Sequence, residues 1–464
     1  MPTRIQPRFV LSVLLAVVLL AAAGCASEPP PNLVFIVVDT LRADRLGCYG
    51  AERETTPAID ALAARAVRFH RAYATAPWTR PSIASMLTGL YPTSHGASTV
   101  DLMLPDSVAT LAGMLQAEGW ATAGVISHGV ISRRAGFARG FDHWQQSEAR
   151  GHEHISTAGV TGQALEQLDR LAGGAQPFFL FVHYFDPHYF WHRHDDADFA
   201  ADSAGRLNGR QSIWQLRGMR QELTGEELAF IRDTYDEEVR HTDGGVGRLL
   251  ERLGELGLES DTVVVFTADH GEEFMEHGWI GHTRSLYEEL VRVPLIIRVP
   301  GAAPAVVHRP VSLVSLVPTL LDLLCGPCLD EEYTFQGPSL APLIGGEEAN
   351  QGEGDADAEG IFFEVSFDQP EDWGAEKTAH KKGILLDGWK LIRDEAGGGL
   401  ELYNLEQDPG ETANLAQARP GVRDRLLARL EARVQRLGTA VDAQRLELDE
   451  RELEQLRGLG YLED

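Results

Sequence analysis

Two patterns of hydrophobic positions alternate along the chain. Five short segments consist largely of apolar residues and predict strands buried on both faces, at residues 32–39, 120–127, 177–184, 262–269 and 293–299. Between them, apolar residues recur at helical spacing and predict helices at residues 57–66, 107–118, 224–256 and 313–324. We expect Asp106 or Ser107 to cap the second of these helices. Strands separated by helices indicate an α/β fold with a mostly parallel sheet sandwiched by helices.

The pattern changes in the last quarter of the chain. An acidic, glycine-rich stretch at residues 345–360 is typical of a surface loop. Shorter strand-like runs follow at 361–366, 382–386, 389–393 and 400–405, and a helix with one apolar face is predicted at 422–437. We therefore divide the folded chain into a main domain at residues 33–350 and a C-terminal subdomain at 351–464, a small antiparallel sheet plus a helix.

The first residues have the features of an export signal. Arg4 and Arg8 precede an apolar run at 10–23 that is too short to span a bilayer. Small residues then lead to Cys25, as in the lipobox of bacterial lipoproteins. We predict a signal peptide at 1–24, lipidation of Cys25, a tether at 25–32, and a lipid-anchored protein in the cell envelope, at the outer membrane facing the periplasm. An ordinary signal peptide or an uncleaved anchor are the alternatives.

One segment carries the most specific chemistry. Residues 79–89 (TRPSIASMLTG) resemble the nucleophile segment of the sulfatases, within the alkaline phosphatase superfamily. Pro81, Thr88 and Gly89 fit the family pattern, whereas Thr79 stands where the family has a Cys or Ser that is oxidised to formylglycine. Threonine carries a β-methyl group and cannot yield that aldehyde. The resemblance therefore implies a sulfatase-like protein that uses Thr79 as a nucleophile, as the threonine-dependent phosphotransferases and phosphodiesterases of the superfamily do.

Further motifs extend this resemblance over nearly the whole mature chain. They occur in the family's order, at residues 38–44 (VDTLRAD), 185–188 (FDPH), 267–271 (TADHG), 287–294 and 402–411. Thr40 and His270 depart from the sulfatase pattern, which has an Asp and an Asn at these places. The Asp-His pair at 269–270 resembles the phosphoryl-transfer branch of the superfamily.

Two predicted strands end in carboxylates, which places Asp39 and Asp269 at the same edge of a parallel sheet. Carboxylates with an imidazole suit a divalent metal ion such as Mn²⁺, Mg²⁺, Ca²⁺ or Zn²⁺. The resemblance implies that Asp39, Asp269 and His270 bind this ion and that Thr79 is a further ligand. The alternative is that both aspartates only form turns at strand ends.

The same resemblance suggests residues that contact the substrate. We expect His188, His282 and Arg80 to bind substrate oxygens, and His282 to protonate the leaving group. The spacing around His128 fits the family loosely, and we expect this histidine at the surface. Thr79 alone would read as the N-cap of a helix that begins near Pro81.

These residues together predict a metal-dependent ester hydrolase that cleaves phosphate mono- or diesters through Thr79. A sulfatase that works without formylglycine, an envelope phosphotransferase and an inactive binding protein remain alternatives. The net charge of −28 argues against a nucleic-acid partner. An anionic ester must therefore be attracted locally, by the metal ion and nearby basic side chains.

Three cysteines remain after Cys25. Cys325 and Cys328 form a Cys-x-x-Cys motif at the end of an apolar helix. No thioredoxin-like pattern surrounds this motif, so we predict a structural disulfide in an oxidising compartment. Cys48 is expected to be a buried free thiol.

Overall fold

The computed structural model describes residues 30–149, 156–195, 197–326, 333–346, 360–367, 378–438, 444–459 and 461. Its centre is a nine-stranded sheet with the order β11-β2-β10-β7-β1-β6-β4-β5, and β12 also pairs with β2. The strands in this order are β11 (Ala305–Val307), β2 (Val67–Tyr73), β10 (Arg292–Arg298), β7 (Thr262–Ala268), β1 (Asn32–Val38), β6 (Phe178–Tyr184), β4 (Ala121–Ile126) and β5 (His143–Gln145), with β12 at Val311–Ser312.

The strand register brings three chain segments to one edge. β1 pairs in parallel with β6 and β7, and Val38 is aligned with Tyr184 and with Ala268. Asp39, Phe185 and Asp269 therefore leave the sheet side by side at its carboxyl end. Nearly every residue of these strands is buried, which explains their continuous apolar sequences.

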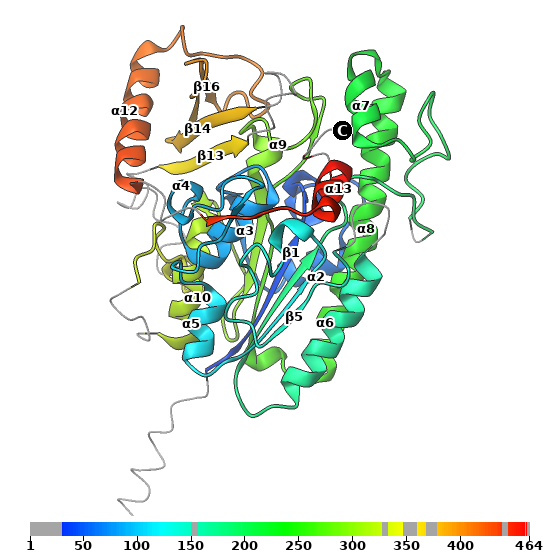
Figure 1. Cartoon of the computed structure of the whole chain (residues 1–464), viewed down its shortest axis with the longest axis vertical. Coiled ribbons are helices and arrows are strands. Elements are labelled where there is room, and N and C mark those ends of the chain that lie inside the picture. The colour runs from blue at the N-terminus through cyan, green and yellow to red at the C-terminus, as the bar shows by residue number, and fades with distance from the viewer. Residues whose placement is uncertain are drawn as a thin grey trace, which may run out of the picture.

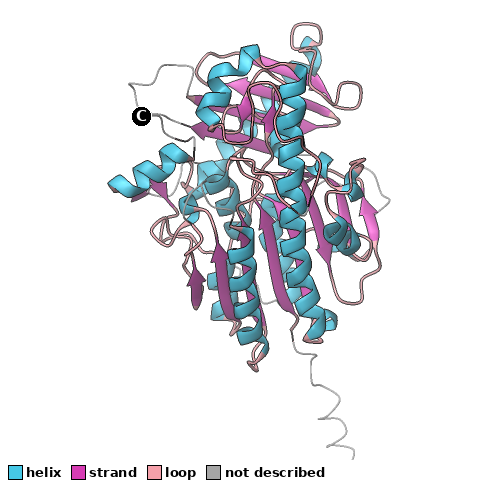
Figure 2. Cartoon of the chain, turned by 90° about the vertical axis from the view of Figure 1, so that its right-hand side faces the viewer, coloured by secondary structure: helices cyan, strands magenta, loops and turns pink. Residues whose placement is uncertain are grey.

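Helices cover both faces of the sheet (Figures 1 and 2). α2 (Pro57–Ala63), α6 (Thr157–Ala172) and α8 (Gly225–Glu255) pack together on one face, and α3 (Thr79–Thr88), α5 (Leu111–Ala117) and α10 (Leu316–Cys325) lie on the other. α8 begins with a capping box, in which the Thr224 hydroxyl accepts from Glu227 N and the Glu227 side chain accepts from Thr224 N. α3 is buried along its whole length, so its ends are held rigidly inside the molecule.

A second, antiparallel sheet lies at the top of Figure 1. Its order is β13-β14-β15-β16, with the bounds Ile361–Phe367, Ala379–Leu386, Trp389–Asp394 and Leu400–Asn404. α12 (Pro420–Leu437) packs its apolar face, with Leu426 and Leu430, against Ile384 and Leu402 of this sheet. The α/β class and the small C-terminal sheet with its helix are confirmed.

Several predicted elements differ from the structure in instructive ways. β10 runs antiparallel to both of its neighbours, which an apolar run cannot reveal. β2 escaped prediction because its sequence VRFHRAY carries three polar residues that remain half exposed. The helix predicted at 107–118 begins at Leu111, since the Thr110 hydroxyl, and neither Asp106 nor Ser107, accepts from Gly113 N.

The predicted signal peptide and Cys25 lie outside the described residues. Within the described part of the chain, no helix is both long and apolar enough to cross a membrane. The end of the chain also holds a feature that the sequence pattern did not predict. β17 (Gln444–Arg445) pairs with β3 (Leu102–Met103), and α13 (Glu450–Gly458) follows it, so the chain returns from the small sheet to the main domain.

Candidate active site

Four predicted residues meet in a buried cluster at the carboxyl edge of the central sheet. Thr79 Oγ1 lies 3.5 Å from Asp39 Oδ2 and 3.4 Å from His270 Nε2. The same nitrogen lies 3.4 Å from Asp39 Oδ1 and 3.6 Å from Asp269 Oδ2. All four side chains are fully buried. The structure thus brings together the four residues that the resemblance predicted to be the nucleophile and the metal ligands.

The backbone fixes the orientation of these side chains. Thr79 is the first residue of α3, and its neighbour Trp78 is extended, so the hydroxyl lies at the positive end of a buried helix. Asp269 Oδ1 accepts from Thr40 N at 3.2 Å and from His270 N at 2.9 Å, which turns Oδ2 toward the cluster. Thr40 adopts a left-handed conformation with φ 55°, where the chain turns sharply after β1.

The cluster has the donor set and the electrostatics of a cation site. Asp39 Oδ1 and Asp269 Oδ2 are buried oxygens without a hydrogen-bond partner. His270 Nδ1 donates to Gly271 O at 2.9 Å, which leaves the Nε2 lone pair facing both carboxylates. Burial and the neighbouring Asp269 raise the pKa of Asp39 well above its usual range. A divalent cation would offset this repulsion, and the residues present fit one.

Two further histidines complete the cluster. His128 Nε2 and His183 Nε2 lie 3.9 Å and 3.8 Å from Asp39 Oδ2. The prediction of a surface position for His128 is wrong, since only 1% of this residue is exposed. One ligand atom each from Asp39, His128 and His188 also lie within 4.8 Å of one another, which gives a second candidate metal position. The position of His183 near this edge could have been predicted, because His183 is the penultimate residue of a buried strand.

His282 lies next to this cluster, with its ring centroid 4.5 Å from that of His270, and is paired with a carboxylate. His282 Nδ1 is 2.9 Å from Glu272 Oε1, and both side chains are fully buried. Burial raises the pKa of Glu272 well above its usual range, with Arg217 and Arg42 opposing the shift. We did not single out Glu272 from the sequence, although it follows His270 by two residues.

His188 lies beside His282 in the same buried cluster. Its centroid lies 4.9 Å from that of His282, and the ring stacks on Phe185 at 4.6 Å. His188 Nδ1 lies 3.1 Å from Tyr189 O and donates to it, so the neutral ring carries its proton on Nδ1. The chain reaches this position through the turn after β6, as the motif at 185–188 implied.

Arg80 does not join the cluster. Its guanidinium donates to four main-chain carbonyls, including Val130 O at 2.8 Å and Leu102 O at 3.0 Å. Burial lowers the pKa of Arg80 to about 10. The prediction that Arg80 binds substrate oxygens is therefore not supported by its contacts. Arg80 instead ties α3 to the loops beside it, because it follows Thr79 on the helix and points to the opposite side.

A tyrosine from the end of the chain enters the cluster. Tyr461 is fully buried, and its hydroxyl oxygen lies 3.4 Å from Thr79 Oγ1 and 3.3 Å from His282 Nε2. Burial and the carboxylate of Asp39 raise the pKa of Tyr461 well above its usual range. No sequence pattern predicts this position, because Tyr461 is an isolated aromatic residue after a charged helix.

Two cysteines, Cys48 and Cys325, are among the described residues. Cys325 ends α10 and is disulfide-bonded, whereas Cys328 lies outside the described residues, so their pairing stays a prediction. Cys48 is a free thiol, as expected, but it is half-buried.

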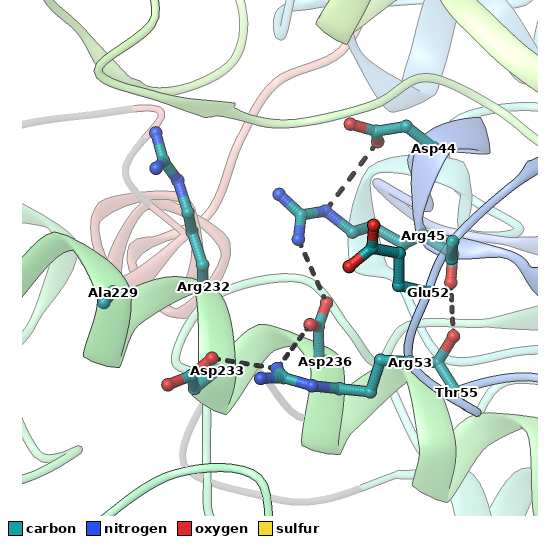
Figure 3. Close-up of a pocket in the computed structure, with 10 residues that line it drawn as sticks. Asp44, Arg45, Glu52, Arg53, Thr55, Ala229, Arg232, Asp233 and Asp236 are labelled. Atoms are coloured by element: carbon teal, nitrogen blue, oxygen red, sulfur yellow. Dashed lines mark hydrogen bonds and ion pairs between the residues drawn. The ribbon is translucent and has the colours of Figure 1, made fainter.

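A separate charged pocket of about 320 Å³ opens beside α8 (Figure 3). Arg53 pairs there with Asp233 at 2.8 Å and Asp236 at 2.7 Å, and Arg45 lies 3.6 Å from Asp236. Because these charges are paired within the wall, we assign the pocket no ligand.

Comparisons with known proteins agree on one family. The family model named Sulfatase matches residues 31–327, and the model named N-sulphoglucosamine sulphohydrolase, C-terminal, matches residues 275–439. Arylsulfatase A of Homo sapiens is 30% identical over 92% of this chain and 91% of its own length. Ulvan-active sulfatase of Formosa agariphila is also 30% identical, but over 63% of this chain and 61% of that protein.

Solved structures share the fold at lower identity. Phosphonate monoester hydrolase of Agrobacterium radiobacter has a TM-score of 0.71 at 22% identity, covering 91% of this chain and 98% of that chain. A protein solved in complex with its substrate D-glucosamine-2-N,6-O-disulfate has a TM-score of 0.70 at 22% identity, covering 88% of this chain and 98% of that chain. The family match covers more than half of the chain, and the chain therefore belongs to the sulfatase family and is a hydrolase of the alkaline phosphatase superfamily.

Proposed function

We propose that this protein is a metal-dependent hydrolase of phosphate mono- or diesters in which the Thr79 hydroxyl attacks phosphorus. The position of Thr79 carries the proposal, because its Oγ1 lies within 3.5 Å of Asp39 and His270 at the start of a buried helix. Threonine cannot become the formylglycine that the resembling sulfatases use. Its ester with phosphate can be cleaved by water, which makes phosphorus the better suited target.

Asp39, Asp269 and His270 would hold the metal ion, with Thr79 as a further ligand. Their fit rests on the two unpartnered carboxylate oxygens and on the inward Nε2 of His270. A divalent ion bound there would lower the pKa of the Thr79 hydroxyl and offset the negative charge of the substrate. The identity of the ion among Mn²⁺, Mg²⁺, Ca²⁺ and Zn²⁺ is left to the experiment below.

In the first step, Thr79 Oγ1 bonds to phosphorus while the bond from phosphorus to the leaving oxygen breaks. Asp39 Oδ2, 3.5 Å from Oγ1, takes the hydroxyl proton. His282 Nε2 gives its proton to the leaving oxygen, and Glu272 stabilises the protonated imidazole until then. The products are an alcohol or phenol and a phosphorylated Thr79.

In the second step, water attacks phosphorus and its proton passes to His282 Nε2. The bond from phosphorus to Thr79 Oγ1 breaks, and Asp39 returns the proton to the threonine. Phosphate leaves from a monoester, or a phosphomonoester from a diester, and the site is restored. An envelope phosphotransferase would use an alcohol in place of water at this step.

The buried histidines provide donors for the substrate oxygens. His128 Nδ1 accepts from Val130 N at 3.2 Å, so its proton sits on Nε2, which faces the cluster. His188 Nε2 can donate in the same way when the ring is protonated. Fixed donors in a water-excluded site stabilise developing charge more than they would in solvent.

Sulfate-ester hydrolysis without formylglycine is the second candidate. It is supported by the names of the most similar relatives, which include arylsulfatase A and choline-sulfatase. An inactive binding protein is the weakest alternative, since a decayed site has no reason to retain Asp39, Thr79, Asp269 and His270 together. Measured metal content separates this last alternative from the enzymes.

A matched panel tests the proposal. Aryl sulfate, phosphate monoester and phosphodiester with the same aryl group are each assayed with Mn²⁺, Mg²⁺, Ca²⁺ and Zn²⁺. We expect a phosphate ester to give the largest kcat/KM. A larger kcat/KM for the sulfate, with Thr79 intact, would establish the second candidate instead.

Location remains part of the proposal. The lipobox at Cys25 supports a lipid anchor in the cell envelope, with the enzyme at the outer membrane facing the periplasm. Such a tether would restrict the enzyme to ester substrates that reach this compartment.

A further inference from the structure

The last described residues of the chain reach directly into the proposed active site. Tyr461 follows α13, and in Figure 1 this helix lies near the carboxyl end of β1 and below α7 (Ile213–Met219). Trp214 Nε1 of α7 donates to Arg457 O at 3.1 Å, and Tyr189 Oη donates to Leu459 O at 3.0 Å. The tail thus lies across the site and is held by groups around it.

Aromatic side chains surround the Tyr461 ring inside the site. It packs near Trp78, Phe367 and His282, with ring centroids 5.8 Å, 6.0 Å and 5.8 Å away. Thr79 and His282 are themselves fully buried with the tail in this position. An ester therefore cannot reach Thr79 while this ring occupies its position beside Thr79 and His282.

The hydroxyl of Tyr461 stands where the reacting group must be. An attacking oxygen needs the reacting atom at about 3 to 3.5 Å, and a general acid needs the leaving oxygen at about 2.6 to 3.2 Å. The Tyr461 hydroxyl lies 3.4 Å from Thr79 Oγ1 and 3.3 Å from His282 Nε2. One oxygen thus occupies the space between nucleophile and acid, and a bound ester would collide with it.

Few side chains of the tail are buried. Among the described residues from 444 onward, only Leu456, Leu459 and Tyr461 are buried. The ion pairs of Arg134 with Asp449 and Glu452 involve side chains at the surface, where such pairs contribute little. The tail can therefore leave its position without disturbing the core of the fold.

We propose that residues 444–459 together with Tyr461 form an autoinhibitory plug, in which the Tyr461 ring occupies the position of the substrate and must leave before an ester binds. The inference rests on the proposed function in taking Thr79 as the attacking group. When only a fraction of the protein is in its open state, the apparent dissociation constant of a ligand equals the intrinsic constant divided by that fraction. Removing the ring should therefore tighten binding of any anion at this site.

The test uses the full-length, metal-loaded protein with inorganic phosphate and inorganic sulfate as probes. Calorimetry compares wild type, Tyr461→Ala, Tyr461→Phe and the exposed control Tyr333→Ala. We expect Tyr461→Ala to tighten binding of the preferred ion by about tenfold or more. Tyr461→Phe, which keeps the ring, should change it less, and Tyr333→Ala should match wild type. The second measurement uses wild type alone. If ion binding displaces the tail, the preferred ion should accelerate tryptic cleavage at Arg451 and Arg457.

The outcomes separate the plug from the proposed function. Unchanged ion affinity in a folded Tyr461→Ala protein, or unchanged cleavage of wild type, overturns the plug even if esters are hydrolysed through Thr79. A loss of turnover in Tyr461→Phe with unchanged ion affinity also overturns it, because the hydroxyl would then assist the reaction. Tighter ion binding in Tyr461→Ala without hydrolysis of any ester overturns the proposed function and leaves the plug standing.

Discussion

The pair of Glu272 and His282 determines how the leaving group is protonated in this account. Glu272 Oε1 lies 2.9 Å from His282 Nδ1, and neither side chain is exposed. A hydrogen bond to a charged group contributes about 1.5 to 3 kcal/mol of net stabilisation. A change of about 1.4 kcal/mol in the activation free energy changes a rate tenfold. Glu272→Gln should therefore lower kcat/KM about 10- to 100-fold for a phosphate ester with a poor leaving group.

The dependence on the leaving group makes this prediction specific. A 4-nitrophenyl ester leaves as a stable anion and needs little protonation, so its kcat/KM should fall much less than that of an alkyl ester. The assay compares the two esters across pH, and the alkaline limb for the alkyl ester should move to lower pH in Glu272→Gln. Glu273→Gln is the matched control, because Glu273 instead accepts from His277 N and Trp279 N. Equal losses for both esters would refute the role of this pair in protonating the leaving group.

Other changes test separate parts of the account. Asp269→Asn should lower the divalent metal content of the purified protein severalfold, as measured by elemental analysis, and should lower turnover by orders of magnitude. A metal content equal to that of wild type would show that Asp269 does not bind the ion. Burial and Glu289 raise the pKa of Glu273 from 4.5 to about 7, so the folded state holds a proton that the unfolded chain releases. Stability from this group is present below about pH 4.5 and is lost as pH rises to about 7. Urea unfolding should therefore show Glu273→Gln to be more stable than wild type near pH 8, by up to about 3 kcal/mol, and no different below about pH 4.5. Cys25→Ser should leave the precursor unprocessed or mislocalised, and normal membrane fractionation would refute the lipid anchor.

The middle strands of the central sheet, from β10 to β4, and the carboxylates at their edge could be predicted from local sequence. The runs at 32–39 and 262–269 are apolar throughout because both faces of β1 and β7 are covered. Each run ends in a carboxylate, and parallel pairing in register then brings Asp39 and Asp269 together. The same logic would have found His183, since it stands one residue before the end of β6.

The rest depends on contacts that no local pattern encodes. The burial of His128 arises from the turn after β4, which folds back over the cluster. The direction of Arg80 follows from the phase of α3, since adjacent helical residues point to different sides. Tyr461 reaches Thr79 across 382 positions of sequence, and only the folded path of α13 brings them together.

The most direct test of the central claim is a rapid-quench experiment on the metal-loaded enzyme with a phosphate ester. Peptide mass spectrometry should find residue 79 as unmodified threonine before the reaction and as phosphothreonine during turnover, and Thr79→Ala should show neither adduct nor turnover. An adduct on another residue, or undiminished turnover in Thr79→Ala, would contradict the account.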